Sequence, residues 1–538
     1  MIPAIVVFLY LAIVLYVGIF AFRKSRPSGE DYFLAGRSIG PFVFLFSLFG
    51  TNMTAFAILG SSGLAYQRGI GVYGLMAACS SFVIPFTLFL IGTRLWAHGK
   101  RFGHMTQVQF FRDRWECSAI GTLFFALTAL MLVPYVIIGV MGGGATLEAL
   151  STVLGPDGQP VMVEVLRGGQ TVLEARHWVS YEVGGAIVAL VVMSYVFLGG
   201  MRGTAWVNAF QTILFLSFGA VAFYLISRNL GGFDQVMRRL GADPETASLL
   251  TRQRIPQAEF FSYFFIPLSS IMFPHISIMC LTARRVSSFK HTVIFYPVCI
   301  LAIWLPSVYL GVIAADQFPG LTAGESDDVI LRLLTLHSDA WVAGILGAAI
   351  MACVMASDSQ ILALSTMFTE DIFAHYGGRQ RFGGVAEVWT GRLFVVGVAL
   401  VAWLAALGLK DRVGIFELAI RFAFSGFAAL APVMLAALFW KRSTKWGALA
   451  AALWVACAVL GTWYLHGLTR EIAPAPGQPP VPIFAGLGGL LQRTPGNVTV
   501  AGFLPVLPMV LVSALLVWAV SLATRPPSAA TLDRYFPR

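Results

Sequence analysis

The sequence predicts an all-α polytopic membrane protein with 13 transmembrane helices, and three observations carry this prediction. Of the 538 residues, 58% are hydrophobic and only 12% are charged, whereas soluble domains carry about 25% charged residues. The mean hydropathy is +0.79. The apolar residues form long, continuous runs rather than the short alternating segments of a β-barrel. A helical bundle in a bilayer satisfies all three observations.

Each predicted helix is an apolar run of about 20 residues or more, the length that crosses a bilayer. The first run is followed at once by Arg23 and Lys24, without a cleavage motif, so we expect a retained helix rather than a signal peptide. The 13 runs are residues 3–22, 40–65, 73–96, 118–147, 182–199, 204–227, 258–282, 292–315, 339–368, 391–408, 414–440, 445–466 and 501–523. Residues 149–181, 228–257 and 467–500 are expected to be outside loops.

The basic residues between these runs predict the orientation of the chain. They concentrate in alternate connections, and short cytoplasmic loops are enriched in Lys and Arg. We therefore expect the N-terminus outside and the C-terminus in the cytoplasm, in the cell (inner or plasma) membrane. The net charge of +10 follows from this topology and does not indicate nucleic-acid binding. The residues expected inside are Arg23, Lys24, Arg26, Arg37, Lys100, Arg101, Arg112, Arg114, Arg284, Arg285, Lys290, Lys441, Arg442, Lys445, Arg525, Arg534 and Arg538.

The second run has an unusual middle, because Gly50, Thr51, Asn52 and Thr54 stand close together within it. Unpaired backbone groups are costly in hydrocarbon, so a broken helix is tolerated where it lines a cavity inside the protein. Freed carbonyls of such helices bind cations near the bilayer midplane in transporters. The alternative is a small-residue face that packs against a neighbouring helix.

The seventh run is interrupted in a comparable way by Pro267, Ser269, Ser270 and Pro274. Five runs counted from each interruption give two halves, residues 40–227 and 258–440. Because five is odd, the halves have opposite orientations, which predicts an inverted repeat with the substrate between two broken helices. Residues 1–39 then form a first helix and cytoplasmic loop, and residues 441–538 form two accessory helices and a short tail.

The ninth run contains a candidate half of a sodium site. Cys353, Ala356 and Ser357 are spaced i, i+3 and i+4, so they share one helix face. A freed carbonyl and a serine hydroxyl, completed by two carbonyls of the broken second run, would form an oxygen cage suited to a hard monovalent cation. The alternative is that Ser357 bonds to its own helix. The six cysteines show neither a CxxC pair nor metal spacing, so we expect no metal other than sodium, and no enzyme.

Polar groups in three further runs are candidates for coupling and substrate binding. Asp358 is a carboxylate in an apolar run, where charges are costly and usually functional, although near the cytoplasmic end it would simply be solvated. Asn208 and Gln211 share a face of the sixth run, with helix–helix hydrogen bonding as the alternative. His275 is a candidate donor to a substrate carboxylate or a packing residue, and Tyr135 offers a hydroxyl at comparable depth. Together with Asn52, Thr54 and Phe56, these two residues form the predicted substrate site.

Four stretches resemble the sodium:solute symporter family of proline, pantothenate, sugar and monocarboxylate transporters. They are residues 31–37 (Asp-Tyr-Phe-Leu-Ala-Gly-Arg), 50–54, 199–211 and 352–371. The resemblance implies a LeuT-type fold of two inverted five-helix repeats and alternating access coupled to Na⁺. It also implies that the backbone carbonyls of Gly50 and Met53 bind sodium together with Cys353, Ala356 and Ser357.

The chain departs from the family pattern at two places. Val207-Asn208 replaces Thr-Asp, which removes a carboxylate, and the motif around Ala356 is one residue shorter than Met-Ser-Thr-x-Asp-Ser; Asp358 is a candidate replacement for the lost charge. The run Phe273-Pro274-His275 is most similar to the monocarboxylate transporters. We therefore expect sodium symport of a small organic solute, preferably a monocarboxylate. The alternatives are an amino-acid, proline or sugar symporter and a sodium-independent uniporter or sensor. The expected partners are the solute, sodium and the lipid bilayer, without nucleic acid or an obligate protein partner.

Overall fold

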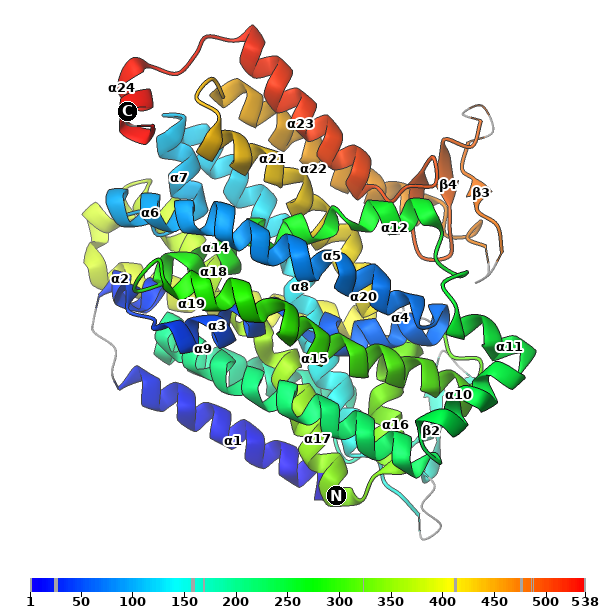
Figure 1. Cartoon of the computed structure of the whole chain (residues 1–538). Helices are drawn as coiled ribbons and strands as arrows, with labels where there is room; N and C mark the ends of the chain where they lie inside the picture. Colours follow the sequence, from blue (N-terminus) through cyan, green and yellow to red (C-terminus); the bar gives the residue numbers. More distant parts are fainter. Residues whose placement is uncertain are drawn as a thin grey trace.

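The computed structural model describes residues 2–23, 28–155, 160–167, 170–322, 324–410, 414–474, 478–484, 486 and 488–536. The predicted cytoplasmic residues Lys24, Arg26 and Arg538 lie outside this part of the chain. The described residues form a helical bundle (Figure 1), so the predicted fold class is confirmed.

Most helices follow the predicted runs with differences of a few residues at their ends, but α19 begins at Gly378, well before the predicted run 391–408. They are α1 (Ile2–Phe22), α2 (Gly29–Leu34), α3 (Pro41–Asn52), α4 (Ser61–Arg68), α5 (Gly71–Thr87), α6 (Thr93–Phe102), α7 (Gln107–Arg114), α8 (Ser118–Leu150), α9 (Tyr181–Asn229), α10 (Phe233–Ala242), α11 (Pro244–Ala247) and α12 (Gln257–Tyr263). The second half contains α13 (Ser269–Met272), α14 (Pro274–Thr282), α15 (Ser288–Gln317), α16 (Val329–His337), α17 (Ala340–Val354), α18 (Asp358–Met367), α19 (Gly378–Leu409), α20 (Ile415–Leu418), α21 (Ser425–Phe439), α22 (Lys445–Leu468), α23 (Val506–Ala523) and α24 (Ala529–Tyr535).

Both predicted breaks are present. The helix pair Pro41–Asn52 and Phe56–Arg68 is bent by 58°, and the pair Gln257–Met272 and Pro274–Thr282 by 50°. At the first break Met53 has an extended backbone (φ −103°, ψ 95°). At the second, Phe273 is non-helical (ψ 127°), and Pro274 begins α14 at a position where its missing N–H costs nothing. Each break therefore leaves backbone groups without helical partners.

Helix α9 spans two predicted runs and reverses direction at Gly200. Gly200 has φ 50° and ψ −145°, outside the helical region. Tyr195 and Asn208 bond to the two carboxylate oxygens of the same residue, Asp358. On a straight helix their Cα atoms would be about 20 Å apart, too far for both contacts. The two arms of α9 therefore lie side by side as a hairpin.

Length and composition mark 10 helices in the described residues as able to cross a membrane, or up to 12 if each bent pair is one span. The predicted count of 13 also requires the two arms of α9 to count separately, and it stays a prediction. The repeat boundaries at residues 40–227 and 258–440 likewise stay predictions. The broken helices lie within the bundle, where every residue of Phe56–Gly60 and of α14 is buried. Helices α19 and α22 lie at its edge, because only 28% of each of the spans Gly378–Leu409 and Lys445–Leu468 is buried.

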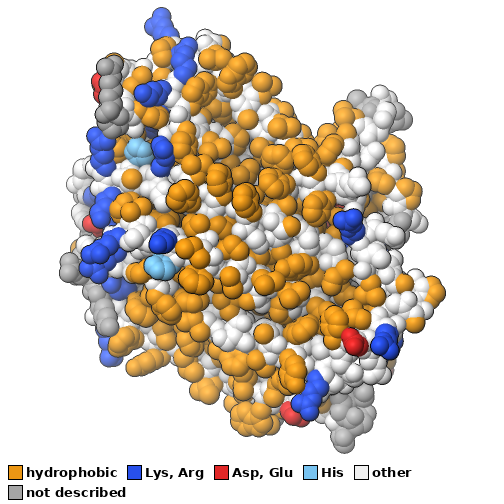
Figure 2. Space-filling view, viewed as in Figure 1, with side chains coloured by type: hydrophobic (Ala, Val, Ile, Leu, Met, Phe, Trp, Pro, Cys, Tyr) orange, Lys and Arg blue, Asp and Glu red, His pale blue; other side chains and the backbone are white. Residues whose placement is uncertain are grey.

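The chain termini lie at opposite ends of the bundle, as an odd number of spans requires (Figure 1). Lys and Arg side chains gather at the end that carries α2, α6 and α24 (Figure 2). This end is the predicted cytoplasmic face, and the orientation stays a prediction.

The three expected outside loops lie at the other end, but they are not irregular. They contain the hairpin β1–β2 (Met162–Arg167, Gln170–Ala175), helices α10 and α11, and a small sheet of β3 (Val481–Pro482), β4 (Leu491–Arg493) and β5 (Val498–Val500). The expectation of irregular loops was wrong here. These segments are rich in turn-forming residues, and their strands and helices are too short to show a periodic pattern in the sequence.

Candidate sodium and substrate site

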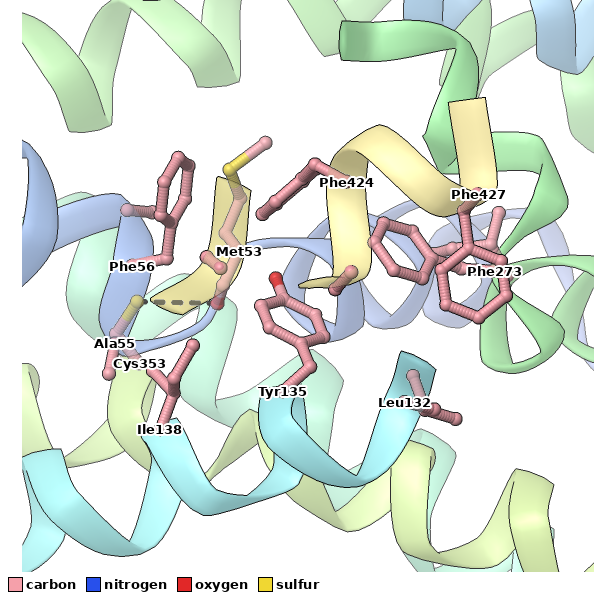
Figure 3. Close-up of a cluster of buried hydrophobic side chains, with 14 of the residues drawn as sticks. Met53, Ala55, Phe56, Leu132, Tyr135, Ile138, Phe273, Cys353, Phe424 and Phe427 are labelled. Carbon is pink, nitrogen blue, oxygen red and sulfur yellow. Dashed lines mark hydrogen bonds between the residues drawn. The ribbon is translucent and has the colours of Figure 1, made fainter. Parts of the chain in front are cut away.

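The break between α3 and α4 lies against the ninth predicted span. The Cys353 thiol at the end of α17 donates to the carbonyl oxygens of Met53 (3.3 Å) and Thr54 (3.2 Å). Figure 3 shows the thiol beside the non-helical segment. The carbonyl of Thr54 also accepts from the backbone N–H of Ala57 (2.8 Å). A cation at this place would compete with the thiol proton for two oxygens of the kind that hard cations prefer.

The other predicted sodium ligands are buried near the break, but none of their side chains is hydrogen-bonded to its carbonyls among the described residues. Ala356 and Ser357 form the 3₁₀ turn η7 (Met355–Ser357), which packs against α3. The Ser357 hydroxyl faces α8, where a Cβ added to Gly139 would lie 2.3 Å from it. Among the described residues, no hydrogen bond connects Ser357 to Gly50 or Met53. The Gly50 carbonyl accepts from the backbone N–H of Met53 (3.1 Å), whereas the Met53 carbonyl accepts from the weak thiol donor of Cys353. Of the predicted pair, the Met53 carbonyl is therefore more easily available to a cation.

The predicted substrate residues Thr54, Phe56, Tyr135 and His275 form one group on the other side of the break. The Thr54 hydroxyl donates to the Tyr135 hydroxyl (3.1 Å). The Tyr135 ring stacks on Phe273 at 5.3 Å between centroids and lies 6.3 Å from the His275 ring. Figure 3 shows Tyr135 reaching from α8 toward the break between α3 and α4.

Phe56 closes one wall of this group by packing against Phe416 and Phe424 of the span Ile415–Phe439, with ring centroids at 5.1 and 4.8 Å. Asn52 takes a different partner, because its amide donates to the Tyr296 hydroxyl on α15 (2.6 Å). Four of the five predicted substrate residues are therefore brought together directly.

His275 is buried at the first turn of α14, and neither of its ring nitrogens has a hydrogen-bond partner among the described residues. Gln360 on α18, which packs against α14, is also buried, and in the same part of the chain neither of its side-chain polar atoms is paired. Buried polar groups are normally satisfied, and exceptions call for an explanation such as a ligand. These two side chains offer both donors and acceptors.

A second polar cluster surrounds Asp358, which is fully buried rather than solvated. One carboxylate oxygen accepts from the Tyr195 hydroxyl (2.9 Å). The other accepts from the Asn208 amide (3.1 Å) and from the hydroxyl and backbone N–H of Ser359. All of these donors are neutral. The negative charge is therefore hydrogen-bonded but not balanced, which suits a cation or a proton.

Sequence reasoning paired Asp358 with Asn208 but missed Tyr195, Tyr296, Phe416 and Phe424. A tyrosine or phenylalanine within an apolar run carries no signal of its own, because 43 phenylalanines share that pattern. Gln211, predicted on the face of Asn208, donates to Tyr10 on α1 (2.9 Å) and serves helix packing. Arg112 and Arg114 were interpreted only as topological charges. Both are buried, and Arg112 pairs with Asp371 (3.7 Å).

Two broken helices that pack against each other, with freed carbonyls at one break and aromatic side chains beside it, are typical of secondary transporters. No group of three or more His, Cys, Asp or Glu in the described residues could hold a metal ion.

Comparison with known proteins identifies the class more closely. The chain matches the model of the sodium:solute symporter family over residues 32–156 and 160–455, and it belongs to this family. It is 26% identical over 528 residues to the sodium/proline symporter of Salmonella typhimurium, covering 92% of this chain and 94% of that protein. It is 25% identical over 465 residues to the high-affinity proline transporter of Bacillus subtilis, covering 85% and 90%.

Among solved structures, a Na⁺-coupled sialic acid symporter in a substrate-bound, outward-open state has a TM-score of 0.72 at 14% identity, with 98% of this chain and 99% of that chain covered. The nucleobase–cation symporter MHP1 has a TM-score of 0.54 at 12% identity, with 95% and 99% covered. The chain is therefore a sodium-coupled solute symporter in a membrane and not an enzyme.

Proposed function

We propose that the protein couples sodium entry to the uptake of a small zwitterionic solute of the proline class across the cell membrane. The single observation that carries this proposal is the contact of Cys353 with the carbonyls of Met53 and Thr54, next to the Thr54–Tyr135 bond. A cation bound by these carbonyls would lie next to the predicted substrate residues Thr54 and Tyr135, which supports coupling at a single helix break. The sodium/proline relatives support the solute class.

The composition of the candidate site favours a solute without net charge. The predicted substrate residues and the rings of Phe273, Phe416 and Phe424 include neither Arg nor Lys, the usual partners of an anion. A zwitterion has a carboxylate that could accept from the imidazole of His275, whose ring nitrogens have no partner among the described residues, at the positive N-terminal end of α14. Its apolar part fits the aromatic wall. The composition of the site therefore favours a solute of the proline class over a monocarboxylate.

With one sodium ion, coupling energetics favour a zwitterion over a monocarboxylate, whereas a second cation, as proposed below for Asp358, would raise the accumulation of either solute. One sodium ion moving down a tenfold gradient releases about 1.4 kcal/mol, and crossing 100 mV adds roughly 2.3 kcal/mol. A zwitterion gains both terms, about 3.7 kcal/mol, which supports accumulation on the order of 500-fold. A monocarboxylate carried with one sodium moves no net charge and gains only the roughly tenfold chemical term.

We propose that Met53 and Gly50 carbonyls with Cys353, Ala356 and Ser357 hold the first sodium ion, and that Asp358 with Asn208 serves a second cation. The test is uptake of labelled proline, acetate, pyruvate and glucose into proteoliposomes, with an inward sodium gradient or with choline in its place. Proline accumulation that requires sodium supports the proposal. Sodium-dependent accumulation of acetate or pyruvate instead would show that the substrate is a monocarboxylate. Equilibration without sodium dependence would refute coupling.

Replacement of Ser357 tests the first ion site. Ser357→Ala should raise the sodium concentration for half-maximal transport about tenfold, because a polar contact to a charge is worth at least about 1.5 kcal/mol. Ser307→Ala is the matched control, since Ser307 is also buried but donates to Ile303 O of its own helix (2.8 Å). Unchanged sodium dependence in Ser357→Ala would remove this residue from the site.

A further inference from the structure

A pocket with a volume of about 340 Å³ lies at the basic end of the bundle, away from the transport site. It is formed by α7, the start of α22 and the segment that leads into α24. A single water needs only about 10–15 Å³ of such space, so the pocket has room for a much larger group. Its charged lining residues are Arg114, Lys445, Arg525 and Glu116, three cations against one carboxylate. Glu116 is already engaged, since it accepts a hydrogen bond from Thr531.

Arg114 carries a buried positive charge that a bound anion would balance. Its side chain is fully buried, and its Nε and Nη2 donate to Ala437 O (3.1 Å) and Trp440 O (3.3 Å) at the end of α21. Nη1 is buried and has no hydrogen-bond partner in the part of the chain that the structure describes. Burial lowers the pKa of Arg114 to about 10, so the group stays charged at neutral pH. Within the described residues no carboxylate pairs with it, and an unbalanced buried charge is costly.

The other donors of the pocket are unengaged. Lys445 and Arg525 are exposed, and no hydrogen bond or ion pair of either side chain is found in the described chain, apart from Lys445 lying over the Trp446 ring at 5.7 Å. Lys445 also begins α22, a helix of 24 residues whose N-terminal N–H groups favour an anion. The donor set is therefore two flexible cations, one fixed guanidinium and a helix N-terminus.

The pocket opens at the edge of the bundle. Trp446 is 55% exposed, and only 28% of the span formed by α22 is buried. Tryptophan is typical of the membrane–water interface. Figure 1 shows α24 beside α7 at the end where the basic side chains of Figure 2 gather. A phosphate bound here would sit at headgroup depth, with hydrocarbon chains along α22.

We propose that this pocket binds the phosphate of an anionic phospholipid from the cytoplasmic leaflet. Arg114, Lys445 and Arg525 neutralise the headgroup, in the way that basic pockets between helices hold acidic lipids. Because Ser528 and Thr531 complete the pocket, the bound lipid also fastens α24 to α7. The C-terminal helix then becomes sensitive to the lipid composition of the membrane.

The test measures lipid binding to the full-length protein in detergent by native mass spectrometry, with phosphatidylglycerol, phosphatidylcholine and inorganic phosphate as probes. Each basic residue near a surface contributes about fivefold to acidic-lipid affinity. Lys445→Gln with Arg525→Gln should therefore weaken phosphatidylglycerol binding about 30-fold. The matched control, Arg284→Gln with Arg285→Gln, removes two exposed charges from the same end and should leave this binding within about twofold.

Three results would overturn the proposal. Equal loss in both double variants would mean attraction to the whole basic surface rather than a site. Equal affinity for phosphatidylcholine would remove the role of net charge. Displacement of phosphatidylglycerol by inorganic phosphate at equal concentration would identify a site for a free anion instead of a lipid. Because Lys445 and Arg525 are exposed, both double variants should keep the thermal unfolding midpoint of the wild type, measured in the same detergent.

Discussion

Asp358 combines full burial with hydrogen bonds from neutral donors only. If it serves a second cation, Asp358→Asn removes the charge and keeps the size of the side chain, with one oxygen left to accept from either Tyr195 or Asn208. The maximal accumulation ratio should then fall, on the order of 500-fold if one sodium ion is lost. Steady-state accumulation in proteoliposomes measures this. A variant that accumulates normally, or that only unfolds more easily, would indicate a structural role.

Asp327, outside the predicted spans, makes a pH-dependent contribution to stability. Burial raises its pKa well above the usual value, although the Ile415 N–H donates to it (2.6 Å). Between about pH 4 and that raised pKa, the folded protein holds a proton that the unfolded chain has released. The stability due to this residue is therefore full below about pH 4 and is lost as pH rises.

Replacing this carboxyl by an amide removes the pH dependence. Asp327→Asn should be more stable than the wild type at neutral pH, by about 1.4 kcal/mol per unit of pKa shift, and the difference should vanish near pH 4. Unfolding midpoints between pH 4 and 8 measure it. Asp316→Asn is the control, because Asp316 pairs with Arg239 (2.9 Å) and its loss should not stabilise. A constant difference at all pH values would contradict the assignment.

For single residues, the sequence predicted functional candidates where a polar side chain interrupts an apolar run. Asp358, His275 and Asn208 stand out because polar groups in apolar runs are rare. Tyr195 and Phe424 do not stand out, since their roles depend on which helix packs against them. The Ser357 hydroxyl shows the same limit: helical spacing placed it on the face of Cys353, but the η7 turn directs it toward Gly139.

The hairpin of α9 depends on one glycine. With φ 50° at Gly200, a Cβ would lie 2.4 Å from Tyr32 O. Gly200→Ala should cost at least about 1–3 kcal/mol for the backbone alone and separate Asn208 from Asp358. Thermal unfolding and sodium-driven transport measure the two effects. Gly397→Ala is the control, because nothing lies within 4 Å of its added Cβ. Equal behaviour of the two variants would contradict the hairpin argument.

Helices and their breaks were predictable where the sequence changes from an apolar run to proline or small polar residues. Proline and clustered small polar residues marked both broken helices, because they remove backbone hydrogen bonds that a bilayer cannot replace. The hairpin β1–β2 and the sheet β3–β5 were missed. Strands of two to six residues have no periodicity that separates them from loops.

The basic end of the whole molecule is closed by buried ion pairs between distant segments. Asp371 accepts from Thr106 (2.8 Å) and pairs with Arg112, and Asp31 pairs with Arg202 (2.6 Å). Asp371→Ala should destabilise the protein by about 3–5 kcal/mol, because it leaves a buried guanidinium unbalanced. Thermal unfolding in detergent measures this cost.

A double replacement separates charge balance from packing. Arg112→Met with Asp371→Leu should recover most of the lost stability, since an apolar pair of similar volume often replaces a buried ion pair without cost. If the double variant is as unstable as Asp371→Ala, the hydrogen bonds to Thr106 and to the Asp371 carbonyl (2.9 Å from Arg112) carry the stability instead.

The Cys353 thiol gives the transport cycle a built-in chemical reporter. It is fully buried in this structure, while Cys457 is exposed and Cys117 partly so. With the other five cysteines replaced by alanine, a small alkylating reagent would reach Cys353 only in molecules whose pathway has opened. The labelling rate would then count opening events directly, and sodium bound at the same carbonyls would change that rate before any solute had moved.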